Sequence, residues 1–487
     1  MENFKMKEKT TQNMKRVVIE PVTRVEGHGK VTILLDEKNQ VKQARLHIVE
    51  FRGFERFIQG RFYWEMPVIV QRLCGICPVS HHLAAAKAVD RIAGAEKLTP
   101  TAEKMRRLMH YGQTLQSHAL HFFHLSSPDL LFGFDADPTI RNIIGVAAKY
   151  PDIAVQGVML RKYGQEIIKA TAGKKIHGTG AIPGGINKNL SIEERDFFLK
   201  DIKQMMKWAH GAVKIAKDYT LENIETVKPF GTFESNHMSI VRKDGAMDLY
   251  DGGLRVIDAD GKKIIDHVDN QKYLDYVAEE VRPWSYMKFP FLKSIGPENG
   301  WYRVGPLARI NACDFIDTPE AEKARKEFMA VTNGKPNGYS LAYHWARMIE
   351  LLHSMEKIQE LLNDPDLQGT DLVVKGKRRH EAVGIIEAPR GTLFHHYKVD
   401  DNDQVTMANL IVSTTNNNEA MNRAVQKVAK DHLNGVEITE GLLNHIEVAI
   451  RAYDPCLSCA THALGKMPLI VKVYDCEGNL LDSKSKG

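Results

Sequence analysis

Hydrophobic and polar residues alternate with two different periods along this chain. Near its start, the runs RVVIE, KVTILL and QARLHIVEF alternate with a period of two and are separated by Gly, Asp and Asn. They predict three β-strands. Longer stretches with helical spacing follow, and local signals mark where they begin. Pro78 suits the first turn of a helix, and Ser191-x-x-Glu194 is a capping box for a helix that extends through Lys217.

Thr99-Pro100 is a further helix start, a cap followed by a proline in the first turn. Additional helices are predicted at 319–332, 338–362, 403–432 and 437–452. Between about 232 and 300 the chain is richer in Gly, Asp and Lys, with short alternating runs, which predicts a small β-rich insertion. The fold class expected is mainly α (α+β): a core of long bundled helices with small peripheral β elements. Residues 1–15 are expected to form a flexible N-terminal tail.

Composition narrows the class of protein. The chain has 487 residues, of which 43% are apolar and 26% charged, as in a globular protein with a sizeable core. A net charge of +5 without a long Lys/Arg run gives no electrostatic reason to expect a nucleic-acid partner. The polar N-terminus lacks the apolar region of a signal peptide, and no run of 18 apolar residues predicts a membrane span. We therefore expect a cytoplasmic protein.

Four of the six cysteines form two C-x-x-C pairs near opposite ends of the chain. Cys74 and Cys77 lie in QRLCGICPVSHH, and Cys456 and Cys459 lie in DPCLSCATH. Together they offer four thiolates, which suit zinc, nickel or iron. A structural zinc site is one interpretation, although paired knuckles of that kind are usually about 15–20 residues apart. A catalytic metal site is another, and a dithiol redox pair is a third that does not explain two pairs.

The two cysteine motifs resemble the signature motifs of the large subunit of [NiFe] hydrogenases. The segments VTRVEGHGKV, VEFRGFERFIQGR, TPTAEKMRRL, WSYMKFP and IEAPRGTLFHHY are also similar to that family, especially to its cytoplasmic, bidirectional, NAD-linked group. The likeness runs from Arg16 to the end of the chain. It implies a large-subunit domain at 16–462 that performs reversible, heterolytic H2 cleavage.

The resemblance also implies the roles of particular residues. All four motif cysteines would bind nickel, and Cys77 and Cys459 would also bridge to an iron that carries CO and CN ligands. Glu26, in RVEGH, matches the family's proton-relay glutamate next to Cys456. Arg390, in EAPRG, matches an arginine above the open face of the metals.

A second metal site, expected to hold Mg, is implied at Glu55 and His462. His81 is expected to donate a hydrogen bond to the sulfur of Cys77. Cys313 and Cys476 match no ligand position, and we expect each to be an ordinary thiol. Without the resemblance, Glu26 is interpreted as a surface or turn residue and Arg390 as part of a surface salt bridge. His81 is then equally well interpreted as a packed helix residue.

The chain continues past the second motif. In the family, an endopeptidase removes a C-terminal extension after nickel insertion, which implies a cut between His462 and Ala463 and release of residues 463–487. The sequence MPLIVKVYDCEGNLLD predicts a strand, a turn at Glu477-Gly478 and a second strand. A permanent terminal hairpin is the competing interpretation.

Electrons from H2 must leave through other chains, because no cysteine set remains for iron–sulfur clusters and no nucleotide-binding motif is evident. The resemblance implies an iron–sulfur small subunit, a diaphorase module with FMN and NAD, and, during maturation, nickel-insertion proteins and the endopeptidase. Two alternatives stay open: the same chemistry with a deazaflavin, ferredoxin or dye acceptor, or a non-enzymatic, zinc-stapled scaffold subunit.

Overall fold

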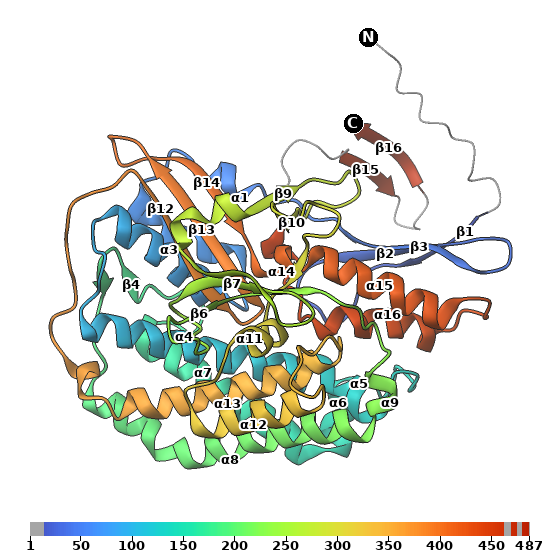
Figure 1. Ribbon diagram of the computed structural model, residues 1–487, viewed down its shortest axis with the longest axis horizontal. Helices are drawn as coiled ribbons and strands as arrows, with labels where there is room; N and C mark the ends of the chain where they lie inside the picture. The colour runs from blue at the N-terminus through green and yellow to red at the C-terminus, as the bar shows by residue number, and fades with distance from the viewer. Residues whose placement is uncertain (1–13, 462–468, 475–479, 487) are drawn as a thin grey trace, which may run out of the picture.

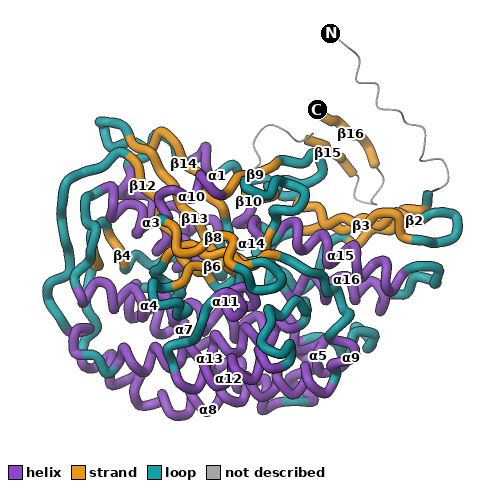
Figure 2. The backbone as a smooth tube through the Cα atoms, in the orientation of Figure 1, coloured by secondary structure: helices purple, strands orange, loops and turns teal. Residues whose placement is uncertain are grey.

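Long helices form the body of the molecule, and small sheets cover one side of it. The computed structural model describes residues 14–461, 469–474 and 480–486. In Figures 1 and 2 the long helices lie together at the bottom, and most of the strands lie above them. The sequence-based expectation of a mainly helical chain with small sheets agrees with this arrangement.

Two buried helices lie at the centre of the hydrophobic core. α4 (Pro100–Leu120) and α13 (Ala342–Leu362) pack against each other, α7 (Pro151–Ala172) packs on α4, and α8 (Ile192–Glu222) packs on α13. α4 and α7 approach closely because glycines face each other: a Cβ at Gly164 would lie 2.6 Å from the carbonyl oxygen of Gly112. Most residues of α4 and α13 are buried around the whole helix circumference, which places these two helices in the interior.

Most of the predicted helices form, and their caps agree with the sequence. The side chain of Thr99 accepts a hydrogen bond from Ala102 N, and Ser191 and Glu194 form the capping box at the start of α8. α8 continues to Glu222, beyond the predicted Lys217. The other helices that the sequence predicted are α3 (Pro78–Ile92), α12 (Pro319–Ala330) and α16 (Glu440–Ala452).

The helix predicted at 403–432 is wrong in its first part. Residues Val405–Ile411 form strand β14, which pairs antiparallel with β13 (Gly391–Val399), and β13 pairs with β12 (Glu381–Ala388). Helix begins only after β14, as α14 (Ser413–Asn416) and α15 (Asn418–Leu433). Hydrogen bonding to β13 overrides the helical spacing of this segment, because strand pairing depends on partners distant in sequence.

The N-terminal strands form as predicted. β1 (Lys15–Ile19), β2 (Gly29–Leu35) and β3 (Val41–Ile48) make an antiparallel sheet in that order. The free edge of β3 lies along α15, where side-chain amides satisfy its N–H groups: Ala44 N donates to Gln426 Oε1 at 2.6 Å. Of the predicted tail 1–15, residues 1–13 lie outside the described residues.

The segment 232–300 is rich in strands. They are β6 (Asn236–Val241), β7 (Gly253–Ile257), β8 (Lys263–Val268), β9 (Val277–Glu280) and β10 (Phe289–Leu292). β6 also pairs with β11 (Tyr302–Arg303). Buried side chains of this segment share a small core with β12, β13 and β14, so the strands support the hairpin that carries Arg390.

Near the C-terminus, β15 (Leu469–Tyr474) and β16 (Leu480–Lys486) pair antiparallel, as the two predicted strands. The predicted turn at Glu477-Gly478 lies outside the described residues. Within the part of the chain that the structure describes, no helix has the length and apolar character needed to cross a membrane.

Candidate metal centre

The first cysteine pair lies between two helical turns. The 3₁₀ turn Val70–Leu73 ends at Cys74, and Cys77 is the N-cap of α3 with Pro78 in its first turn. The backbone N–H groups of Ile76 and Cys77 both point at the sulfur of Cys74, at 3.3 and 3.2 Å. This turn aims both sulfurs at one point, and the N-terminus of α3 favours negative charge there.

The second pair follows the last long helix. α16 ends at Ala452, and Asp454 adopts a left-handed conformation with φ 53° that turns the chain back into the core. Cys456 N donates to Thr414 Oγ1 at 2.9 Å, and Leu457 N donates to the carbonyl oxygen of Glu26 at 2.9 Å. Both contacts fix this segment to distant parts of the chain.

The two pairs meet in the interior. The four cysteines Cys74, Cys77, Cys456 and Cys459 are all buried, and their sulfur atoms lie within 4.8 Å of one another. Cys74 Sγ lies 3.2 Å from Cys456 Sγ. Soft sulfur donors that converge in this way from both ends of a chain form a site for a nickel-, iron- or zinc-like cation.

The charge state of the thiols also favours a cation. Hydrogen bonds from the other three thiols, together with one from His81, hold the pKa of Cys77 well below its ordinary value despite burial. Burial raises the pKa values of Cys456 and Cys459, and crowding by neighbouring sulfurs adds to the effect. Full deprotonation of this quartet therefore needs a compensating positive charge, which a bound metal supplies.

Glu26 lies directly against the second pair. Its carboxylate oxygen Oε2 is 3.1 Å from Cys456 Sγ and accepts a hydrogen bond from Ser458 N at 3.1 Å. Its backbone forms a parallel bridge with Cys456. The structure thus brings together the glutamate and the cysteine that the sequence analysis paired.

A polar route leads from Glu26 to the surface, and sequence reasoning missed it. Ser458 donates through its backbone N to Glu26 and through its hydroxyl to Glu50 Oε2 at 3.0 Å. Glu50 Oε1 lies 2.6 Å from Nδ1 of the exposed His28. Burial would raise the pKa of Glu50, but hydrogen bonds from His28 and Ser458 hold it below its ordinary value. His28 is in the quoted segment RVEGH, so its nearness to Glu26 was the available signal.

Arg390 occupies the turn of the β12–β13 hairpin and is buried next to the thiols. Its guanidinium donates to the carbonyl oxygen and to Oδ1 of Asp454, at 2.7 and 2.9 Å. Although burial alone would lower the pKa of Arg390, Asp454 and the cysteine sulfurs hold it well above the ordinary value. Gly391 permits the turn, since a Cβ there would lie 2.3 Å from Val304 Cγ2 and its φ is 135°. Sequence reasoning found Arg390 but not its counter-ion Asp454.

Of the two ligands predicted for the second metal, only Glu55 lies among the described residues. Glu55 Oε1 accepts a hydrogen bond from Leu410 N at 2.8 Å and lies 3.4 Å from Lys288 Nζ. Glu279 Oε2 also lies 3.4 Å from Lys288 Nζ, and burial raises the pKa values of both carboxyl groups. Two half-buried carboxylates share one ammonium there, which leaves an excess of negative charge that a further cation could neutralise. His462, the other predicted ligand, lies outside the described residues.

A row of buried polar side chains extends from His81 on α3 to strand β13. His81 Nδ1 lies 3.2 Å from His395 Nε2, and His395 Nδ1 lies 2.6 Å from the Tyr397 hydroxyl. These contacts fix the imidazole of His81 next to Cys77. Cys313 lies apart from the quartet, and burial raises its pKa to about 12, as expected of an inert thiol. Cys476 is outside the described residues.

Comparison with protein families gives matches along most of the chain. The family described as "Nickel-dependent hydrogenase" matches residues 52–137 and 155–462, and a family described as "HoxL-like" matches residues 16–51.

Curated relatives match over almost their whole length. The HoxS subunit beta of the NAD-reducing hydrogenase of Cupriavidus necator is 50% identical, with 97% of this chain and 100% of that protein covered. One of the subunits of the vhc F420-non-reducing hydrogenase of Methanococcus voltae is 44% identical, with 96% and 99% covered.

Solved structures give the same result. A crystal structure of an NAD+-reducing [NiFe]-hydrogenase in the H2-reduced state superposes with a TM-score of 0.91 at 58% identity, covering 92% of this chain and 100% of the other. The Ni-Fe-Se hydrogenase of D. vulgaris Hildenborough, at 23% identity and a TM-score of 0.75 over 92% of this chain and 100% of the other, shares the fold.

Proposed function

The chain belongs to the nickel-dependent hydrogenase family as a [NiFe] hydrogenase large subunit, and we propose that it cleaves H2 with residues Glu26 and Arg390 and passes the electrons through partner subunits to NAD. The observation that carries the proposal is the buried quartet of thiols with Glu26 and Arg390 next to it. A zinc-stapled scaffold would not need a carboxylate and a guanidinium at the metal.

The residues present fit a NiFe centre. Cys74, Cys77, Cys456 and Cys459 would hold nickel, and Cys77 and Cys459 would also hold iron. When bound, this centre supplies the Lewis-acid and redox chemistry that polarises H2 and accepts two electrons. A small cavity next to Cys77 and Cys459 is lined by Leu393, Val412, Ser413 and other groups. Apart from the thiols, His81 and Arg390, the lining is apolar or carries hydroxyl groups, which would suit CO and CN ligands on the iron.

Heterolytic cleavage releases a proton, and Glu26 is placed to take it. The sulfur of Cys456 lies within hydrogen-bond distance of the Glu26 carboxylate and can donate a proton to it directly. From there, we propose, the proton passes through the groups around Ser458 to Glu50 and leaves at His28, which is exposed to solvent. The Ser458 hydroxyl, Glu50 and His28 can each donate and accept a proton, whereas the backbone N–H of Ser458 only donates and holds the Glu26 carboxylate in place.

Arg390 acts as a fixed positive charge. Asp454 holds the guanidinium through two hydrogen bonds, so little reorganisation is needed when negative charge develops on the side of the centre that Arg390 faces. The side chain cannot serve as a base, since its pKa is raised further by the thiolates around it. Its role is therefore electrostatic.

We propose Mg as the second metal, held by Glu55 and by His462. The excess of carboxylate over ammonium among Glu55, Glu279 and Lys288 supports a cation at this place. Oxygen ligands are those that Mg²⁺ prefers. The ion would fasten the segment after Cys459 to the β14 region, where Leu410 N binds Glu55.

Electrons must leave the chain, because only Cys313 and Cys476 remain after the quartet. An iron–sulfur small subunit is expected on the apolar surface near the first motif. The exposed residues there are 41–56% accessible and comprise Val49, Phe51, Phe57, Phe62, Trp64 and Val68. Arg52 connects this surface to the centre by donating to the carbonyl oxygen of Leu73 at 3.1 Å. Apolar patches of this kind mark protein contacts.

The acceptor proposed is NAD, reached through a diaphorase with FMN, since the 50% identical relative is the beta subunit of an NAD-reducing hydrogenase. A second candidate keeps the same chemistry with another acceptor, because a 44% identical relative belongs to an F420-non-reducing hydrogenase. H2-dependent NAD reduction by the purified complex, against reduction of a viologen dye, separates the two.

We also propose that an endopeptidase removes residues 463–487 once nickel is in place. The family match ends at residue 462, and a solved chain that is fully covered corresponds to 92% of this one, which supports a shorter mature form. Intact-mass measurement tests the cut: active enzyme should end at His462, and activity from protein of full length would contradict it.

The metal proposal is tested on the purified complex. We expect one nickel per large subunit by elemental analysis and infrared bands from CO and CN bound to iron. Zinc alone, without these bands and without H2 uptake, would support a scaffold instead.

A further inference from the structure

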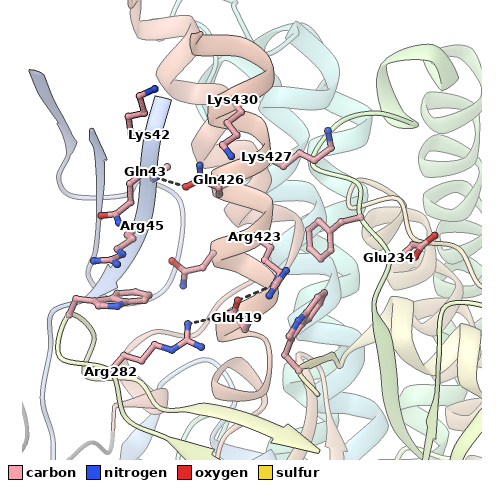
Figure 3. A pocket seen from close by; sticks show the side chains of 15 residues that line it. Lys42, Gln43, Arg45, Glu234, Arg282, Glu419, Arg423, Gln426, Lys427 and Lys430 are labelled. Atoms are coloured by element: carbon pink, nitrogen blue, oxygen red, sulfur yellow. Dashed lines mark hydrogen bonds and ion pairs between the residues drawn. The ribbon is translucent and has the colours of Figure 1, made fainter. Parts of the chain in front are cut away.

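A strongly basic groove lies on the surface between β3 and α15, away from the cysteine quartet. It has a volume of about 770 Å³, and Figure 3 shows its lining side chains. Six of them are cationic and two are acidic; the cations are Lys42, Arg45, Arg282, Arg423, Lys427 and Lys430. Nothing in the proposed hydrogen chemistry uses these groups.

Only part of this positive charge is neutralised within the chain. Glu419 pairs with both Arg282 and Arg423, at 2.7 and 2.9 Å, so its single negative charge is divided between two cations. Arg45 and Lys430 have no ion pair with any residue that the structure describes. Burial, together with repulsion from the neighbouring Arg282, lowers the pKa of Arg45.

Aromatic rings hold the guanidinium groups in place. The guanidinium carbon of Arg45 lies 4.9 Å from the ring centre of Trp284, and that of Arg423 lies 4.3 Å from Trp301. Such cation–π contacts reduce the side-chain freedom that binding would otherwise remove. The rings are occupied by arginines, so the groove offers positioned cations and not a stacking platform for a base.

The backbone under the groove is rigid. Ala44 N and Leu46 N on the edge of β3 donate to the side chains of Gln426 and Asn422 of α15, at 2.6 and 2.9 Å. The cations on these two elements therefore keep their spacing. Arginine and tryptophan together are also the residue types most enriched at the energetic centres of protein interfaces.

The groove is continuous with the apolar surface at Val49–Val68. Trp284 is two residues from Tyr286, and the ring of Tyr286 lies 5.6 Å from that of Phe51. Val49 directly follows β3, the strand that carries Arg45. A partner seated on the apolar surface would thus lie next to the groove.

We propose that this groove binds an acidic segment of a partner subunit of the hydrogenase complex. The inference rests on the proposed function in so far as it assumes that the chain works with such subunits. Carboxylates of the partner would pair with Arg45 and Lys430, which form no ion pair with the described residues. These pairs would make association of the partner faster and more specific than the apolar contact alone.

The test is a graded charge series in the full complex. Arg45→Gln with Lys430→Gln removes two charges, and Arg45→Glu with Lys430→Glu reverses them. Neither pair breaks an ion pair among the described residues. Lys203→Glu with Lys207→Glu, on the exposed side of α8, changes the net charge by the same amount elsewhere. Subunit dissociation is measured by native mass spectrometry and sedimentation at low and high salt.

We expect the dissociation constant of a partner subunit to rise on the order of tenfold for neutralisation and further for reversal at low salt. At about 1 M salt, where screening is strong, the difference should shrink. The α8 variant should behave like the wild type. An unchanged dissociation constant in the charge-reversed variant overturns the inference. The inference is also overturned if the groove binds pyrophosphate, and charge reversal abolishes that binding without changing subunit affinity.

Failure of this inference is distinguishable from failure of the proposed function. Nickel content and viologen reduction by the wild-type complex report the metal centre and do not depend on the groove. If both are present and the charge series has no effect on assembly, the groove assignment is wrong and the hydrogenase assignment stands.

Discussion

Glu26→Gln isolates the proton-transfer step from the rest of the centre. Glutamine has nearly the shape of glutamate, and its carbonyl oxygen can still accept the hydrogen bond from Ser458 N that Glu26 accepts at 3.1 Å. What the variant lacks is a group that takes a proton from Cys456, whose sulfur lies 3.1 Å from Glu26 Oε2.

Two magnitudes separate a catalytic effect from a structural one. Loss of a positioned acid–base group costs about 10²–10⁴-fold in rate, or roughly 3–5 kcal/mol. Exchange of a charged hydrogen-bond acceptor for a neutral one costs about 1 kcal/mol of stability. Turnover should therefore fall by orders of magnitude while nickel content and thermal stability remain close to those of the wild type.

The assay compares H2-dependent dye reduction with H2 binding. Infrared spectra recorded under H2 should still change in the variant, because Glu26 is not a metal ligand in this scheme, while steady-state dye reduction should be nearly lost. Glu26→Asp, which keeps a carboxyl group but shortens it, should recover part of the rate. Turnover of Glu26→Gln within threefold of the wild type, at full nickel content, would refute the proton-relay role.

Four further substitutions test other parts of the structure. Cys456→Ser should abolish nickel retention in elemental analysis, and stoichiometric nickel with full activity would contradict its role as a ligand. Arg309→Met leaves Glu350 and Glu387 buried without their cation, at 2.5 and 2.8 Å in the wild type, and should cost about 3–5 kcal/mol in urea unfolding; a loss below 1 kcal/mol would argue against a structural network. Despite burial, the Arg309 contacts hold the pKa of Glu350 at about 2. The stability that ionised Glu350 contributes is therefore complete above its unfolded pKa of about 4.5 and is lost as pH falls toward 2. Glu350→Gln should make the urea midpoint less dependent on pH in this acid range. Tyr397→Phe removes the hydroxyl that lies 2.6 Å from His395 and should cost about 1–3 kcal/mol with nickel retained, as calorimetry and metal analysis would show.

Local signals in the sequence predicted local structure well. Thr99 and Ser191 act through side chains that bind N–H groups three residues away, so their helix starts depend on nothing distant. The β12–β13 hairpin was missed because its residues are buried on both faces and show no alternation. Val405–Ile411 was predicted as helix for a related reason: its pairing with Phe394–Val399 is not visible in either segment alone.

In the candidate site, too, local features could be predicted from the sequence and contacts between distant segments could not. The cysteine motifs could be found from sequence because each pair is a short turn with its own spacing. Asp454, Ser458 and Glu50 were missed as participants because their roles depend on where Arg390 and Glu26 lie in three dimensions. In the structure Asp454 is distinguished as a non-glycine residue with positive φ, a conformation that often marks a constrained functional turn.

The way the site is closed constrains how it is filled. All four sulfurs are buried, so a metal cannot reach them from solvent in the closed form. The second cysteine pair is held by contacts to the N-terminal segment: Arg451 donates to the carbonyl oxygen and hydroxyl of Thr23, at 3.0 and 2.8 Å, and Leu457 N donates to Glu26. Cys74 and Cys77, by contrast, are positioned within one continuous turn and helix. The half-site at Cys74 and Cys77 can therefore exist before the other half docks. Metal that enters at that stage would meet an open pair of thiols, and docking of the 454–461 segment against Thr23 and Glu26 would complete the ligand set. This order gives a physical reason for the proposed role of the C-terminal extension, which would delay docking until the metal is present.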